Sequence, residues 1–182
     1  FESRKRYINS RNTIFQILKL GAVPIINEND TVSTDEIKVG DNDTLSALIS
    51  NLVGADLLII LSNVDGFIKN GETVPEINEI TKEIEKMAKG SDSIYGTGGM
   101  KTKVEAAKIV NNAGIPMIIC KSNEQNIIQR VMEGQDIGTL FIPKECKMKS
   151  KKRWLAHGEK SKGKLIIDEG AEKALLKNGK SL

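Results

Sequence analysis

The chain has 182 residues, of which 39% are hydrophobic and 28% charged, and its formal net charge is +3. This length suits one α/β domain with some additional chain, and so small a charge does not by itself indicate nucleic acid or a membrane surface as a partner. No apolar run approaches the roughly 20 residues that span a bilayer, and no signal peptide is recognisable, so we expect a soluble, cytoplasmic protein.

Apolar periodicity predicts helices and strands in alternation. Between Arg4 and Leu20 apolar residues recur at helical spacing, and Gly21 supplies the expected stop. The next run, Ala22–Ile26, is continuously apolar, which is typical of a strand buried on both faces. Further helices are predicted at 43–53, 101–112 and 124–132, and further strands at 56–61, 115–120 and 138–142.

This alternation predicts a three-layer αβα sandwich with a largely parallel sheet. Right-handed crossovers would place the carboxyl ends of all its strands at one edge, where open sheets bind ligands. Residues 31–40 and 67–77 are too long and too polar for simple connections. We expect both to be excursions at that edge, with Asn70-Gly71 marking a hairpin turn in the second.

The composition changes near residue 150. Lysine and arginine dominate residues 144–153, which is typical of a linker, and a new strand is predicted at 163–168 before a helix at 171–177. We therefore place a domain boundary near residue 150. The chain starts at Phe1 and stops at Leu182 without a pattern that calls for an end, so we expect both ends to be cut from a longer protein.

Few side chains suggest metal or nucleophile chemistry. Cys120 and Cys146 stand in unrelated contexts and are expected to be free thiols. His157 is the single histidine and lies in the basic region, so neither a zinc site nor a catalytic triad is predicted. Trp154 is interpreted as a packing residue and the basic run as a solvated linker, with nucleic-acid contact as the less favoured alternative.

The stretch Gly96–Lys103 carries the clearest chemical signal. Its three glycines let the backbone approach phosphate groups, and the helix that follows offers unpaired N–H groups and the positive end of its dipole. Lys103 lies in the first helical turn, where its ammonium group could stabilise a transferring phosphoryl group. The spacing is not that of a Walker A loop. The alternative is a flexible connection followed by a surface lysine.

Two polar clusters accompany the predicted elements. Asp41, Asn42 and Asp43 stand at the start of a helix, where one capping residue would suffice, so the others are available for a substrate ammonium group, a metal or a catalytic lysine. Asn27–Asp30 follow a predicted strand with more hydrogen-bonding side chains than a turn requires. The alternative is a helix cap in the first case and a plain loop in the second.

Taken together, these stretches resemble the glutamate 5-kinase family over essentially the whole chain. The resemblance rests on Asn27–Asp30, Lys38–Asp43, Gly96–Lys103, Val131–Gly134 with Gly138–Phe141, and Lys152–Trp154 leading to Asp168–Ala171. It implies an amino-acid-kinase fold for residues 1–147 and a basic linker at 148–161. It also implies that residues 162–182 begin a small, β-rich PUA domain, a module named for RNA-modifying enzymes.

The resemblance implies a reaction in which ATP and L-glutamate give L-glutamyl 5-phosphate and ADP, with Mg²⁺, at the start of proline synthesis. Such phosphoryl transfer requires mainly positioning and positive charge, because the substrate carboxylate is itself the nucleophile. The implied glutamate-binding residues are Asp30 and Asn42. The implied catalytic residues are Lys103, which stabilises charge on the phosphoryl group, and Asp43, which orients the catalytic lysines. The implied ATP-binding residues are Ser62, Asn63, Thr97, Gly98, Gly99, Met100, Lys101, Thr102 and Lys103.

The sequence departs from the family pattern in two ways. Asn63 stands where many relatives carry aspartate, and the family's N-terminal portion, with its first lysine, an early phosphate loop and a substrate-contacting serine, is missing. We therefore expect the 182-residue piece alone to be inactive. A homo-oligomer is expected, with the number of subunits left open.

Two alternatives remain at this point. The first is a kinase of the same fold that acts on acetylglutamate, aspartate, carbamate or UMP. The second is an RNA-binding or regulatory module that uses the basic linker and the tail, which a salt-sensitive affinity for RNA would support.

Overall fold

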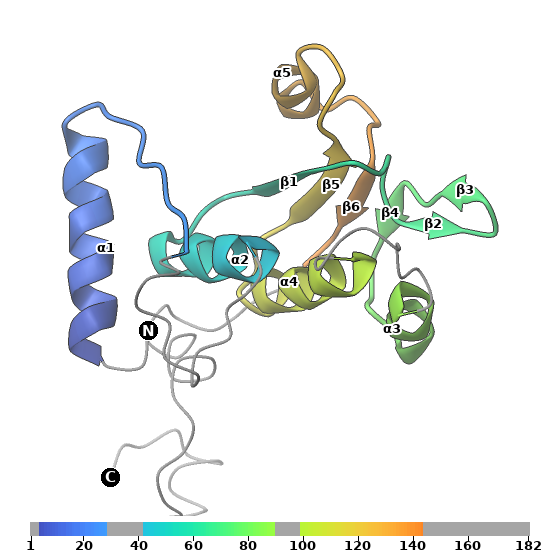
Figure 1. The fold of residues 1–182 in the computed structure, drawn as a ribbon, viewed down its shortest axis with the longest axis horizontal. Helices are drawn as coiled ribbons and strands as arrows, with labels where there is room; N and C mark the ends of the chain where they lie inside the picture. Colours follow the sequence, from blue (N-terminus) through green and yellow to red (C-terminus); the bar gives the residue numbers. More distant parts are fainter. Residues whose placement is uncertain (1–3, 29–41, 90–98, 144–182) are drawn as a thin grey trace, which may run out of the picture.

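The computed structural model describes residues 4–28, 42–89 and 99–143 of the chain (Figure 1). The helices are α1 (Arg4–Lys19), α2 (Asn42–Val53), α3 (Lys82–Lys89), α4 (Met100–Asn112) and α5 (Ile127–Met132). The strands are β1 (Leu58–Ser62), β2 (Ile68–Lys69), β3 (Glu72–Thr73), β4 (Glu76–Ile77), β5 (Met117–Lys121) and β6 (Thr139–Phe141). The predictions that lie outside these ranges concern Asp30, Asp41, Thr97, Gly98, Cys146, Trp154, His157, the excursion at 31–40, the linker at 148–161 and the segment at 162–182.

A four-stranded sheet in the order β1-β5-β6-β4 forms the middle of the described structure. β1 and β5 run parallel, with Leu58 opposite Met117 and Ser62 opposite Lys121, and β4 runs parallel to β6. The predicted α/β class with a largely parallel sheet is confirmed.

The prediction that all strands end at one edge is wrong for β6, which pairs antiparallel with β5, and for its parallel partner β4. Thr139 lies opposite Ile119 and Phe141 opposite Met117, so β6 runs back from the edge at which β5 ends. The chain leaves β5 through α5 and returns antiparallel, and Gly138, with a φ of 76°, brings it directly against Ile119. The candidate ligand edge is therefore formed by the ends of β1 and β5.

Helices cover both faces of the sheet, which agrees with the predicted three-layer sandwich (Figure 1). On one face, α2 and α4 pack against each other and form the larger core cluster with the sheet. Fully buried residues of these two helices are Ala47, Ala106, Ala107 and Val110. Alanine at the helix contact lets the two backbones approach closely. On the other face, Ile127 and Val131 of α5 pack with Cys120 of β5.

Most element boundaries lie within a few residues of their predicted positions. α1, α2 and α4 correspond to the helices predicted at 4–20, 43–53 and 101–112. α5 begins at Ile127 instead of near residue 124, because Asn126 has a left-handed φ of 56°, which interrupts a right-handed helix. α3 was not predicted.

The prediction of a strand at 22–26 is wrong, because the structure shows irregular chain there. Val23 is 85% exposed and Ile25 97% exposed. A strand requires a neighbour that accepts and donates its backbone hydrogen bonds, and no described strand pairs with this run. β1, at the end of the strand order, is likewise unpaired on one side within the described sheet.

The excursion predicted after β1 contains the expected hairpin. β2 and β3 pair antiparallel, and the two turn residues have positive φ values, 54° at Asn70 and 87° at Gly71. Two residues with positive φ are the requirement of a tight hairpin turn whose twist matches the strands. Among the described helices, none is both long and apolar enough to cross a membrane.

Candidate functional site

The start of α2 and the start of α4 lie close enough for their side chains to form an ion pair. The Lys103 Nζ donates a hydrogen bond to Oδ2 of Asp43 at 3.0 Å. The two side chains are only 11% and 15% exposed, so both charges are largely removed from water. Such removal is costly unless the charges compensate each other, and here the ion pair provides that compensation. The structure thus brings together two residues that the sequence analysis assigned to catalysis.

Thr102 contacts the same carboxylate oxygen. Its Oγ1 lies 2.8 Å from Oδ2 of Asp43 and also 2.8 Å from the carbonyl oxygen of Gly99. The Thr102 backbone N–H donates to the Gly99 carbonyl at 3.1 Å. The first turn of α4 is therefore connected to the first turn of α2 through one oxygen atom of Asp43.

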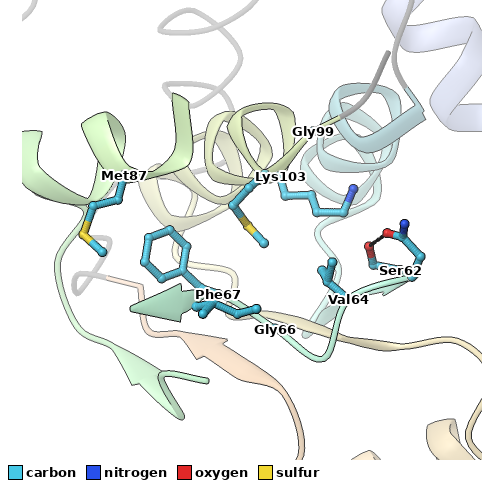
Figure 2. Close-up of a pocket in the computed structure, with 10 residues that line it drawn as sticks. Ser62, Val64, Gly66, Phe67, Met87, Gly99 and Lys103 are labelled. Atoms are coloured by element: carbon cyan, nitrogen blue, oxygen red, sulfur yellow. Dashed lines mark hydrogen bonds between the residues drawn. The ribbon is translucent and has the colours of Figure 1, made fainter. Parts of the chain in front are cut away.

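A pocket opens beside Lys103. Its cavity volume is about 130 Å³, and it is partly open to solvent. Its lining residues are Ser62, Asn63, Val64, Gly66, Phe67, Ile68, Met87, Gly99, Met100 and Lys103. Figure 2 shows Phe67 and Met87 at one end and Ser62 at the other, with the Lys103 amine directed toward the Ser62 end. The pocket therefore has an apolar end and a polar end that carries a cation.

The polar end is built on the carboxyl end of β1. Ser62 is the last residue of this strand, and its hydroxyl donates to Oδ1 of Asn63 at 3.3 Å. The Ser122 N–H donates to the Ser62 carbonyl at 2.7 Å, which ties the end of β1 to the end of β5. Ser62 and Asn63, which the resemblance implies as ATP-binding residues, both lie in the pocket wall.

The apolar end depends on Thr139 in β6. The Thr139 hydroxyl accepts a hydrogen bond from the Phe67 N–H at 2.7 Å and donates one to the Val74 carbonyl at 2.6 Å. A Cβ atom on Gly66 would lie 2.5 Å from the same hydroxyl oxygen, so the chain can approach Thr139 this closely only without a side chain. These contacts hold the Phe67 backbone at the pocket.

α3 supplies Met87 to the pocket and is held by two ion pairs. Lys108 of α4 lies 2.6 Å from Glu85, and Lys69 of the hairpin lies 3.1 Å from Glu83. The hydrogen bond from Lys108 is the main reason that the pKa of Glu85 is lowered from its ordinary value. α3 is thereby connected to the helix that carries Lys103 and to the strands that follow Phe67.

The N-terminus of α4 fits a phosphate group. The residue before the helix is Gly99, which has no side chain to cap the first N–H groups. A Cβ atom there would meet no described atom within 4 Å, so the backbone faces open space as far as the described residues go. The lack of a side-chain cap, the positive end of the helix dipole and the Lys103 ammonium favour an anion at this point.

The described residues provide no protein cage for a metal ion, since they contain no group of three or more His, Cys, Asp or Glu side chains that could hold one. Mg²⁺ is commonly bound through one or two carboxylates together with substrate phosphates.

The remaining described candidates, Asn42 and Lys101, do not line the pocket. Asn42 is exposed at the first position of α2. Lys101 is half exposed and its ammonium lies 4.0 Å from Glu105, one turn further along α4. The pocket residues that sequence analysis missed are Val64, Gly66, Phe67, Ile68 and Met87. The signal for Phe67 and Ile68 was their position in the excursion after β1, whereas nothing in the sequence indicated Met87.

The family model described as "Amino acid kinase family" matches residues 1–121. The chain belongs to the amino acid kinase family. Two solved structures support the fold. UMP kinase from Bacillus anthracis aligns with a TM-score of 0.50 and 14% identity over 72% of this chain and 50% of its own. Carbamate kinase from Giardia lamblia, bound to AMP-PNP, aligns with a TM-score of 0.50 and 21% identity over 74% of this chain and 49% of its own.

Within that family, the chain is similar to curated proteins named "Glutamate 5-kinase". The protein from Desulfotalea psychrophila is 52% identical over 98% of this chain and 50% of its own length. The protein from Carboxydothermus hydrogenoformans is 49% identical over 98% of this chain and 50% of its own length. The chain therefore spans about half the length of these relatives.

Proposed function

We propose that this chain carries the nucleotide and phosphoryl-transfer portion of a glutamate 5-kinase. The reaction would be transfer of the γ-phosphoryl group of ATP to the side-chain carboxylate of L-glutamate. The observation that carries the phosphoryl-transfer part is the Lys103 ammonium, held by Asp43 beside the open N-terminus of α4 and at the polar end of the pocket. The choice of glutamate is supported by the 52% and 49% identity to proteins of that name.

In this proposal the nucleotide occupies the pocket with its base toward Phe67 and Met87 and its phosphates toward Gly99 and Lys103. The apolar end offers an apolar surface to a purine, and the polar end offers hydrogen bonds and positive charge. Ser62 and Asn63 lie in the pocket wall, within the region where the ribose and phosphates would pass.

The chemistry then follows from charge and position. An oxygen of the glutamate side-chain carboxylate attacks the γ-phosphorus, a new O–P bond forms, and the bond to the β-phosphate oxygen breaks to release ADP. Lys103 stabilises the negative charge on the phosphoryl oxygens during this transfer, and Asp43 holds the ammonium in place. Mg²⁺ bound to the nucleotide would neutralise further phosphate charge.

The roles of Asp30 and Asn42 in binding glutamate remain part of the proposal. Asn42 precedes Asp43 at the start of α2, and Asp43 accepts the hydrogen bond from the Lys103 ammonium. The linker at 148–161 and the start of a PUA domain at 162–182 also remain proposals. We further propose that turnover requires more polypeptide than these 182 residues, because the relatives are about twice as long.

The test of the acceptor uses the full-length protein, which is the chain extended to the length of its relatives. This protein is supplied with Mg-ATP and one of five acceptors: glutamate, acetylglutamate, aspartate, carbamate or UMP. The 182-residue chain is assayed in parallel. We expect ADP release and an acyl phosphate only with glutamate and only from the full-length protein. Turnover with a different acceptor would overturn the substrate, and turnover by the 182 residues alone would overturn the length requirement.

A further inference from the structure

The hydroxyl of Thr102 has one proton and two acceptors at equal distance. Oδ2 of Asp43 and the carbonyl oxygen of Gly99 each lie 2.8 Å from Oγ1. The Gly99 contact is local and common, since threonine in a helix often bonds a carbonyl three or four residues earlier. The Asp43 contact joins residues 59 positions apart in the sequence and is not explained by helix geometry.

The chemistry of the carboxylate decides between these two acceptors. A carboxylate can only accept hydrogen bonds, so two bare oxygens at 2.8 Å would repel each other. The hydroxyl proton therefore lies on the line to Asp43 while this carboxylate is ionised. Hydrogen bonds to a charged acceptor are also roughly twice as strong as those to a neutral carbonyl.

Oδ2 of Asp43 consequently accepts two hydrogen bonds from neighbouring residues of one helix turn, from Thr102 Oγ1 at 2.8 Å and from Lys103 Nζ at 3.0 Å. The first bond fixes the position of the oxygen, and the second bond uses that oxygen to fix the ammonium. Removal of the hydroxyl would take away one of the hydrogen bonds that position Oδ2, and with it part of what positions the ammonium bound to that oxygen.

We propose that Thr102 is a positioning residue of the phosphoryl-transfer site, which holds Asp43 and through it the Lys103 ammonium. This inference rests on the proposed role of Lys103 in phosphoryl transfer, but it does not depend on which acceptor is phosphorylated. Thr102 does not line the pocket itself, so its removal leaves the nucleotide contacts of the apolar end intact.

The test replaces Thr102 with valine, which keeps the branched shape and removes the hydroxyl, and with serine, which keeps the hydroxyl. Thr81→Val is the matched control, because the Thr81 hydroxyl accepts from the Ile84 N–H at 3.4 Å at the start of α3 and belongs to neither pocket nor ion pair. All variants are made in the full-length protein. Steady-state kinetics are measured with each of the five acceptors, and melting temperatures are recorded.

We expect Thr102→Val to lower kcat by about 10-fold to 100-fold with little change in the KM for ATP, because misplaced catalytic groups affect the transition state more than substrate binding. Thr102→Ser should restore most of kcat, and Thr81→Val should leave it unchanged. Calorimetry should show weaker binding of Mg-ADP with aluminium fluoride, a mimic of the transferring phosphoryl group, and unchanged binding of Mg-ADP alone.

The inference is overturned if Thr102→Val retains kcat and affinity for the aluminium fluoride complex. It is also overturned if Thr102→Ser is as impaired as Thr102→Val, or if losses follow the melting temperature alone. If the protein phosphorylates UMP instead of glutamate and Thr102→Val still lowers kcat, the proposed substrate fails and the inference stands. If the wild type does not bind Mg-ADP, the proposed function and the inference both fail.

Discussion

Thr139 is a polar side chain with no exposed surface, and its hydroxyl joins three segments of the chain. It accepts from the Phe67 N–H and donates to the Val74 carbonyl, both across more than 60 residues of sequence. Buried backbone groups are costly when left without partners. Thr139 is therefore the residue on which the position of the pocket's apolar end depends most directly.

Thr139→Val is expected to lower the free energy of unfolding by about 1–3 kcal/mol, since it keeps the shape and removes the partner of a buried N–H group and a carbonyl. Thr139→Ser keeps the hydroxyl and should cost less. Denaturant unfolding of the two variants and the wild type measures the difference. Wild-type stability in Thr139→Val, or a larger loss in Thr139→Ser than in Thr139→Val, would contradict the role given to the two hydrogen bonds.

Cys120 is fully buried, and burial raises the pKa of its thiol above the ordinary value of 9.0, with a smaller contribution from the negative charge of Glu124. In a Cys146→Ser background, we expect a thiol reagent at pH 8 to modify Cys120 rapidly only after unfolding. The neutral thiol favours the folded state. Its contribution to stability is complete below pH 9.0 and is lost as the pH rises through the folded pKa. Rapid labelling of the folded protein would contradict this.

At the scale of the elements, α3 determines where Met87 lies, and its position depends on ion pairs that are partly exposed. The pKa of Glu85 is lowered, and the first cause is its hydrogen bond with Lys108. A lowered folded pKa stabilises the folded state above the unfolded value of 4.5, and this contribution is lost as the pH falls through the folded pKa.

Lys108→Ala should therefore raise the pKa of Glu85 toward 4.5, which a carboxyl-carbon NMR titration measures. The variant should also raise the KM for ATP modestly, because α3 carries Met87 into the pocket wall. Lys86→Ala, on the exposed side of the same helix, serves as the control. An unchanged Glu85 titration in Lys108→Ala would show that another group holds this carboxylate.

The elements that could be predicted from the sequence are those with a local signal. α1, α2 and α4 show helical apolar spacing, and the turn at Asn70-Gly71 requires residues that tolerate positive φ. α3 was missed because six of its eight residues are charged or alanine, which leaves only Ile84 and Met87 to mark a face. The direction of β6 was missed because strand pairing depends on contacts distant in sequence, such as that between Gly138 and Ile119.

At the scale of the whole molecule, the candidate site likewise has parts with a local sequence signal and parts that depend on contacts distant in sequence. The start of α2 and the start of α4 each carried a recognisable motif, and the structure joins them through Asp43 and Lys103. The apolar wall was not predictable. Phe67 and Met87 belong to no recognisable motif, and both reach the pocket only because of how the hairpin and α3 pack. A residue's role in a pocket depends on tertiary packing, which apolar periodicity does not encode.

The exposure of Leu20, Val23 and Ile25 is the clearest difference between the predicted and the observed molecule. The run has the composition of a buried strand, yet no strand pairs with it among the described residues. The composition of the run therefore predicted a strand, whereas the formation of a strand also requires a neighbouring strand that pairs with it.

The most direct test of the account is glutamate-dependent ADP release from Mg-ATP by the full-length protein and its Lys103→Ala variant, with Lys86→Ala as an exposed-lysine control. We predict turnover that requires glutamate, is retained in Lys86→Ala and falls by about 100-fold or more in Lys103→Ala, because one preorganised charge at the transferring group contributes on this order. Wild-type turnover that Lys103→Ala retains would contradict the central claim that this ammonium stabilises phosphoryl transfer.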